Sequence, residues 1–146
     1  MIGILKRMFG KAAKGPEPDR AIEVELYNAV GVAALDNVGR KDVSVLLYVE
    51  LVEGGLDHCL RYSETDSPHF ASVMTDGNLG TTLWQLYNFV IAQDPEKRWS
   101  KMEYFIEDGE IDVSFSFDPV DEDIPFWERN PVIIEKYFPG RTSVNG

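Results

Sequence analysis

Carboxylates dominate the second half of the chain, and they are the side chains best suited to chemistry or to binding. Between Glu103 and Glu128 the sequence holds ten Asp and Glu residues and no Lys or Arg. Carboxylates can ligate a cation, work as an acid–base pair, or present a negative surface to a basic partner. The ten are Glu103, Glu107, Asp108, Glu110, Asp112, Asp118, Asp121, Glu122, Asp123 and Glu128.

The densest group of acids, Asp118 with residues 121–123, lacks the alternating spacing and closing glutamate of a calcium-binding loop. We therefore interpret it as a solvated acidic loop. The sequence also lacks His-x-x-x-His, Cys-x-x-Cys, a Gly-rich phosphate loop and Gly-x-Ser-x-Gly. We expect no metal site, no cofactor and no enzymatic activity.

The two histidines and the single cysteine do not form a catalytic or ligand pattern. His58 lies on the core side of a predicted strand, so we expect a hydrogen-bonded core or rim histidine. His69 follows Pro68 at the end of a polar loop. Cys59 has no second cysteine to pair with, which fits a reducing compartment.

Two aromatic residues, Phe126 and Trp127, follow the acidic run directly. A negative surface with an aromatic anchor is typical of patches that capture a basic protein. An acidic face that is merely solvated, with Trp127 packed in the core, explains the sequence equally well. The predicted partner-binding residues are Asp112, Asp118, Asp121, Glu122, Asp123, Trp127 and Glu128.

Length and charge limit the classes of partner. A chain of 146 residues with 44% hydrophobic content fits one domain with a real core. The net charge of −11 argues against nucleic acid, because phosphate binding requires an excess of Lys and Arg. No apolar run is long enough for a membrane span, and the N-terminus is a poor signal peptide. We expect a cytoplasmic protein.

The predicted domain organisation is a basic tail and linker over residues 1–18, one α+β domain over residues 19–140, and a frayed end over residues 141–146. Residues 1–14 carry four cations and no acid, with apolar residues at helical spacing. They could form a short basic amphipathic helix that contacts an anionic membrane surface. A tail without membrane contact is the interpretation that we favour.

The clearest element is a hairpin around Asp108-Gly109, a dipeptide that favours a two-residue turn. Closing it there pairs Ile106 with Ile111, Tyr104 with Val113, and residues 102 with 115. Residues 43–53 alternate as a strand, and a turn at residues 54–55 would return it, with position 51 opposite 58.

Helical spacing predicts helices over residues 20–38, 81–93 and 131–138, and residues 69–75 could form a further strand. The order is α-β-β-(β)-α-β-β-α, with hairpins and no βαβ period. It predicts the α+β class, an antiparallel sheet with helices packed on one face.

The second half, residues 80–138, resembles the YezG-like immunity proteins of bacterial polymorphic toxin systems. The resemblance implies a small acidic protein that binds and neutralises a cognate basic toxin, often a nuclease. The chain departs from the pattern in its basic N-terminal extension and at Pro131. The matching residues are Leu83-Trp84, Trp99, Phe105, Asp108-Gly109, Val113, Phe115, Phe117-Asp118 and Trp127-Glu128-Arg129.

The same element order and acidity also resemble type III secretion chaperones and the related YbjN-like proteins. That resemblance implies a homodimer that binds an unfolded effector segment in apolar grooves. The two interpretations differ in the surface that they require. An acidic patch favours an inhibitor, and a stable dimer with exposed apolar grooves favours a chaperone.

Overall fold

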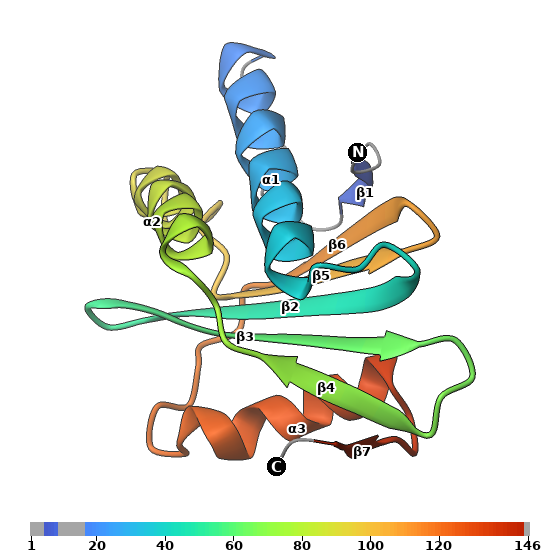
Figure 1. The fold of residues 1–146 in the computed structure, drawn as a ribbon. Coiled ribbons are helices and arrows are strands. Elements are labelled where there is room, and N and C mark those ends of the chain that lie inside the picture. The colour runs from blue at the N-terminus through green and yellow to red at the C-terminus, as the bar shows by residue number, and fades with distance from the viewer. Residues whose placement is uncertain (1–4, 9–16, 145–146) are drawn as a thin grey trace.

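The computed structural model describes residues 5–8 and 17–144, which form one seven-stranded sheet and three helices (Figure 1). The strand order is β1-β6-β5-β2-β3-β4-β7. The predicted α+β class and the order of the elements from the first helix to the last are confirmed. The elements are β1 (Leu5–Met8), α1 (Glu17–Val38), β2 (Val43–Val52), β3 (Gly55–Glu64), β4 (His69–Val73), α2 (Gly77–Ile91), β5 (Lys101–Glu107), β6 (Glu110–Ser116), α3 (Phe126–Tyr137) and β7 (Thr142–Ser143).

The helices lie on both faces of the sheet, so the prediction of a single covered face is wrong. Helices α1 and α2 pack on one face and α3 on the other (Figure 1). Neighbouring residues of β2 show the division, since Leu47 packs in the main core and Leu46 packs beside Ile134 and Phe138 of α3. A strand that is apolar on both sides needs cover on both sides, and β2 is buried from Val43 to Glu50.

The hairpin of β5 and β6 has the predicted register. Ile106 pairs with Ile111 and Tyr104 with Val113. Asp108 and Gly109 both have positive φ, 53° and 76°, as a two-residue hairpin turn of the I′ type requires. The local sequence was sufficient here because only this register buries the apolar side chains of both strands.

The hairpin of β2 and β3 differs from its predicted register by two residues. The turn lies at Glu53-Gly54, so Val52 pairs with Gly55 and Val49 pairs with His58. The sequence pattern predicts the turn one residue later, at Gly54-Gly55. Gly54 takes a positive φ of 82° at the second position of this two-residue turn. The shift of two residues keeps every side chain on its predicted face.

The main core is fixed by hydrogen bonds as well as by packing. Trp99 and Tyr27 are almost fully buried, and the indole Nε1–H donates to the Tyr27 hydroxyl at 2.7 Å. The Tyr104 hydroxyl donates to the backbone carbonyl of Tyr27 at 2.6 Å. These bonds tie the hairpin of β5 and β6 to the middle of α1.

Both edges of the sheet carry short parallel strands that the sequence did not predict. Strand β1 pairs with β6, so residues 5–8 form a strand where we predicted a helix or a tail. The rest of residues 1–14 lies outside the described part of the chain. Strand β7 pairs with β4 through His69 and Thr142, where we predicted a frayed end.

All three helices begin earlier than predicted, and α1 begins at Glu17, inside the predicted linker, rather than at residue 20. Helix α2 begins at Gly77, because the Asp76 side chain caps it by accepting from the Leu79 N–H at 2.9 Å. Helix α3 begins at Phe126, with Pro131 inside it, whereas the sequence pattern predicts Pro131 as its first residue. The ring of Phe126 stacks on the sheet, and that tertiary contact stabilises a first turn that the proline alone argues against.

Candidate functional site

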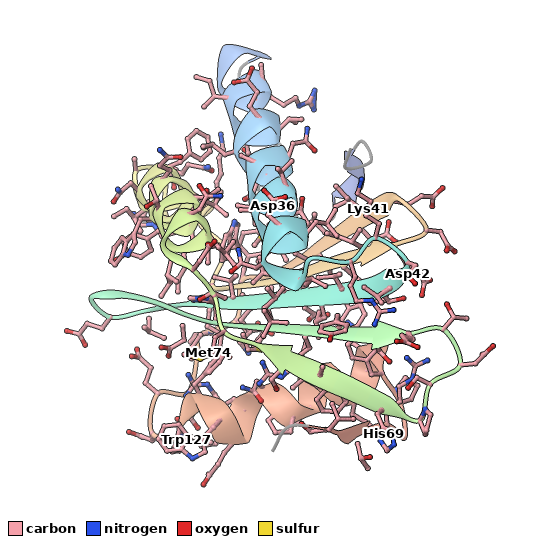
Figure 2. All side chains as sticks on the ribbon, viewed as in Figure 1. Asp36, Lys41, Asp42, His69, Met74 and Trp127 are labelled. Atoms are coloured by element: carbon pink, nitrogen blue, oxygen red, sulfur yellow. The ribbon has the colours of Figure 1, made fainter. Side chains whose placement is uncertain are left out.

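Exposed acidic residues and an exposed tryptophan come together where the chain leaves β6 and enters α3. Trp127 has 73% of its surface exposed, in the first turn of α3 (Figure 2). Glu128 is exposed in the same turn, where the helix dipole favours a carboxylate. The side chains of residues 121–123 in the preceding loop are exposed as well. We call Asp121, Glu122, Asp123, Trp127 and Glu128 the acidic–aromatic patch.

The exposure of Trp127 decides between the two roles that its sequence position allowed. A tryptophan in the core would be nearly inaccessible, as Trp99 is at 1%. Trp127 instead points away from the sheet, with Val132 exposed on the same helix. Its indole is therefore available to a partner.

Arg129 fastens the acidic loop and the start of α3 to the sheet. Its Nη2 and Nε atoms lie 2.6 Å and 3.0 Å from Oε1 of Glu50 in β2. Its Nη1 donates to the backbone carbonyl of Asp121 at 3.1 Å and to that of Ile124. One side chain thus holds residues 121–124 in place against β2.

The carboxylate of Glu50 is 1% exposed and has both oxygens bonded. Its Oε2 accepts from the Tyr48 hydroxyl at 2.6 Å, and the Tyr48 ring stacks on Phe126. Burial, and then the hydrogen bond to Glu50, raises the pKa of Tyr48 above its ordinary value. The same carboxylate raises the pKa of Arg129. Tyr48 therefore remains a neutral donor, and Arg129 a permanent cation, beneath the patch.

A groove of about 460 Å³ adjoins the patch on the side of β3. Trp127 forms one wall, and Met74, which is 95% exposed just beyond β4, forms the other (Figure 2). The volume of this groove lies in the range of ligand and peptide sites. The remaining lining residues are His58, Cys59, Leu60, Arg61, Val73, Thr75, Phe126 and Asn130.

The run of ten carboxylates does not form one surface. The turn that contains Asp108 lies at the end of the sheet where Val45 pairs with Ile106. The acidic loop begins at the opposite end, beyond the pair of Lys101 and Ser116. The two groups of acids are therefore separated by the length of the sheet.

Three further acids of the run also lie apart from Trp127. Glu103 is paired, since its Oε1 accepts from Nζ of Lys136 and from the Tyr137 hydroxyl, each at 2.7 Å. Asp112 lies opposite Phe105, near the last turn of α3 rather than its first. Asp118 is exposed at the start of the loop, where its backbone carbonyl accepts from the Ser100 hydroxyl. The structure brings together five of the seven predicted contact residues.

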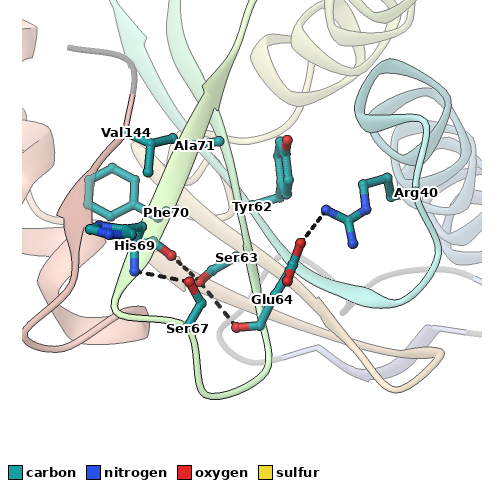
Figure 3. Close-up of a pocket in the computed structure, with 9 residues that line it drawn as sticks. All are labelled: Arg40, Tyr62, Ser63, Glu64, Ser67, His69, Phe70, Ala71 and Val144. Carbon is teal, nitrogen blue, oxygen red and sulfur yellow. Dashed lines mark hydrogen bonds and ion pairs between the residues drawn. The ribbon is translucent and has the colours of Figure 1, made fainter.

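The two histidines have hydrogen-bond partners in the fold. Nε2 of His58 lies 3.1 Å from the Thr75 hydroxyl, as expected of a rim histidine, and burial lowers its pKa. Nδ1 of His69 lies 3.0 Å from the Thr142 hydroxyl. His69 also borders a smaller hollow of about 190 Å³ (Figure 3).

The polar groups around this smaller hollow mainly bind one another. Arg40 bonds to Glu64 at 2.7 Å and to Asp42 at 3.2 Å. The Ser63 hydroxyl donates to the His69 carbonyl at 2.6 Å, and the His69 N–H donates to Ser67 (Figure 3). Because these polar groups already have hydrogen-bond partners, they stabilise the β3–β4 connection and are not available to bind a ligand.

Sequence reasoning missed the roles of Glu50, Arg129 and Met74. Glu50 gave a usable signal, because a carboxylate inside a strand of apolar residues needs a cation if that strand is covered on both faces. Arg129 is the first cation after the acidic run, and that position is the signal that could have identified it. Met74 gave no signal, since its exposure depends on where β4 ends.

Within residues 5–8 and 17–144, no group of three or more His, Cys, Asp or Glu side chains is placed to hold a metal ion. In the same part of the chain, every helix is too short or too polar to cross a membrane. No protein-family model matches this chain, and a comparison with curated proteins gives no match either.

Proposed function

We propose that this protein is an acidic protein-binding module that neutralises a basic toxin protein, as the resemblance to YezG-like immunity proteins implies. The acidic–aromatic patch is its contact surface. The observation that carries the proposal is the 73% exposure of Trp127 beside four exposed carboxylates. Tryptophan is strongly enriched among the residues that dominate binding energy at protein interfaces.

Contacts with the sheet fix the backbone of the acidic–aromatic patch, which favours binding without rearrangement. Arg129 holds residues 121–124 through their carbonyl oxygens, and its own charge is matched by the buried Glu50. The acids of the patch thus keep their negative charge toward solvent while their backbone is fixed. A preorganised surface loses less conformational entropy on binding than a mobile loop does.

Charge complementarity selects a basic partner. The chain has a net charge of −11, and a negative patch steers a positively charged protein into contact at a high rate. Toxins that cleave nucleic acid carry a cationic substrate groove. A patch that covers such a groove would block the substrate as well as bind the toxin.

The test is to mix the full-length protein with the product of the neighbouring gene and to measure binding by isothermal titration calorimetry. We expect a complex with one copy of each protein and a dissociation constant well below micromolar, and loss of the toxin's activity within it. No complex at micromolar concentrations of both proteins would contradict the proposal. A stable homodimer that binds unfolded segments instead would favour the chaperone-like alternative.

A further inference from the structure

Strand β3 has an open edge along half of its length. Its pairing with β4 covers only Leu60 to Tyr62, opposite Val73 to Ala71. After Val73 the chain turns away toward α2, as Figure 1 shows. Residues 56–59 therefore have no strand on that side within the described part of the chain.

The ladder shows which backbone groups are open. The N–H of Leu51 donates to Ser100, away from β3, so the N–H of Val52 faces β3. Val52 pairs with Gly55, and alternate residues of β3 therefore direct their backbone groups toward β2. Between them, Leu56 and His58 direct their N–H and C=O groups outward, along the line that β4 would have followed.

The open edge borders the groove described above. His58 and Cys59 of β3 line it together with Met74, Thr75 and Trp127. An extended segment on this edge could direct alternate side chains into the groove, where apolar groups would contact Met74 and Trp127. The open backbone groups of β3 and the apolar walls of the groove therefore both suit an extended segment with apolar side chains.

Charge selects the occupant. Asp57 lies on β3 next to the open edge, where its Oδ2 is 3.7 Å from Nη2 of Arg129 and 43% of its side chain stays exposed. The loop acids lie near the same end, since the Glu53 N–H donates to Glu122 at 3.4 Å. Arg61 is the cation in the groove wall, and it donates to the Leu60 carbonyl at 3.0 Å. Edge-to-edge pairing of two copies would bring Asp57 and Glu122 of both together, which argues against a second copy.

We propose that residues 56–59 of β3 accept an added strand, an extended segment of the basic partner in which apolar and positively charged residues alternate. The proposal rests on the proposed function and adds how the partner is held. Main-chain hydrogen bonds to Leu56 and His58 would give affinity, and the groove would give specificity. Trp127 would then contact the inserted segment as well as the rest of the partner.

The direct test uses a synthetic octapeptide in which Lys and Val alternate, with binding to the full chain measured by fluorescence anisotropy. We expect saturable binding, weakened about tenfold by N-methylation of alternate peptide amides and abolished when Glu replaces Lys. Equal binding of the N-methylated or the Glu peptide would overturn the proposal. So would the absence of binding at millimolar peptide.

Two variants at position 58 distinguish the contribution of the backbone N–H at the open edge from that of the imidazole side chain. His58→Pro removes an outward N–H at a place where an edge strand tolerates proline, and His58→Ala removes the imidazole but keeps the N–H. We expect His58→Pro to weaken peptide binding about tenfold and His58→Ala less than twofold. Because His58→Pro could also unfold the hairpin, amide hydrogen exchange of residues 55–60 in the wild type gives a second readout. Added peptide should slow it, and unchanged exchange would overturn the proposal.

The same variants distinguish this proposal from the proposed function. If the toxin complex forms but His58→Pro and His58→Ala bind the toxin equally, the module function stands and strand addition fails. If the peptide binds to the edge but the neighbouring gene's product does not bind, the edge stands and the toxin-binding function fails.

Discussion

The guanidinium of Arg129 lies 2.6 Å from the carboxylate of Glu50, and this pair joins the acidic loop to the centre of the sheet. Glu50 is 1% exposed and Arg129 only 12%, so the pair is shielded from water. Two residues far apart in sequence, one inside an apolar strand and one after an acidic run, thereby position the acidic–aromatic patch.

Breaking this pair should destabilise the fold. Arg129→Met leaves the Glu50 carboxylate buried without its cation, and we expect a loss of about 3 kcal/mol in the free energy of unfolding. The measurement is urea unfolding followed by tryptophan fluorescence. Arg40→Met, which breaks the exposed pair with Glu64, is the matched control and should change stability far less. Equal effects of the two variants would show that burial of the pair does not matter.

The hydrogen bond between Trp99 and Tyr27 gives a second stability prediction. Tyr27→Phe removes the acceptor of a buried indole N–H, so we expect a loss of about 2 kcal/mol. The change adds no volume and keeps the ring contact with Phe115. Tyr87→Phe, on a half-buried tyrosine of α2, is the control. Unchanged stability of Tyr27→Phe in urea would mean that water replaces the lost acceptor.

Glu23 predicts a dependence of stability on pH. Its side chain is 3% exposed, Oε2 has no hydrogen-bond partner among the described residues, and burial raises its pKa to about 7, against an opposing effect of Arg20. The folded state therefore keeps a proton that the unfolded state releases near pH 4.5. The contribution of this group is fully present below pH 4.5 and is lost as the pH rises through 7.

Glu23→Gln should remove that dependence, because glutamine stays neutral at every pH. We expect the variant to be more stable than the wild type at pH 8 by about 2 kcal/mol, and the difference to vanish near pH 4. Thermal unfolding between pH 4 and pH 8 is the measurement. A difference of the same size at both ends of this range would contradict the assignment to Glu23.

The charge of the patch should control the rate of association with the basic partner. Glu122→Gln with Asp123→Asn removes two negative charges while keeping the acceptor for the Glu53 N–H. We expect an association rate about fivefold lower at low salt, and a smaller difference at high salt. Glu96→Gln with Asp108→Asn removes the same charge elsewhere on the surface and serves as the control. If both pairs slow association equally, net charge rather than the patch steers the partner.

Local signals predicted the parts of the fold that local chemistry determines. Asp108-Gly109 determined a register, because a two-residue turn with two positive φ values leaves a single apolar pairing. Gly54-Gly55 did not determine a register, because a turn at Glu53-Gly54 and a turn at Gly54-Gly55 bury the same faces of the two strands. The choice between them depends on the neighbouring strands, which lie far away in sequence.

The site needed tertiary information that the sequence does not state. Pro131 argued for a helix that begins there, yet the stacking of Phe126 on Tyr48 and the pair of Arg129 with Glu50 stabilise the earlier turns. With α3 placed on the second face of the sheet, Glu50 becomes buried and Trp127 is turned outward. The acidic loop and Trp127 could be named from the sequence, but not the side chains that hold them.

The most direct test of the account is the affinity of the neighbouring gene's product for two tryptophan variants. Trp127→Ala and Trp84→Ala each remove an exposed indole, 73% and 49% accessible, from different helices on opposite faces of the sheet. Isothermal titration calorimetry should show at least a thirtyfold loss of affinity for Trp127→Ala, about 2 kcal/mol, and less than about twofold for Trp84→Ala. An unchanged affinity of Trp127→Ala, or an equal loss in both variants, would contradict the central claim that the patch is the binding surface.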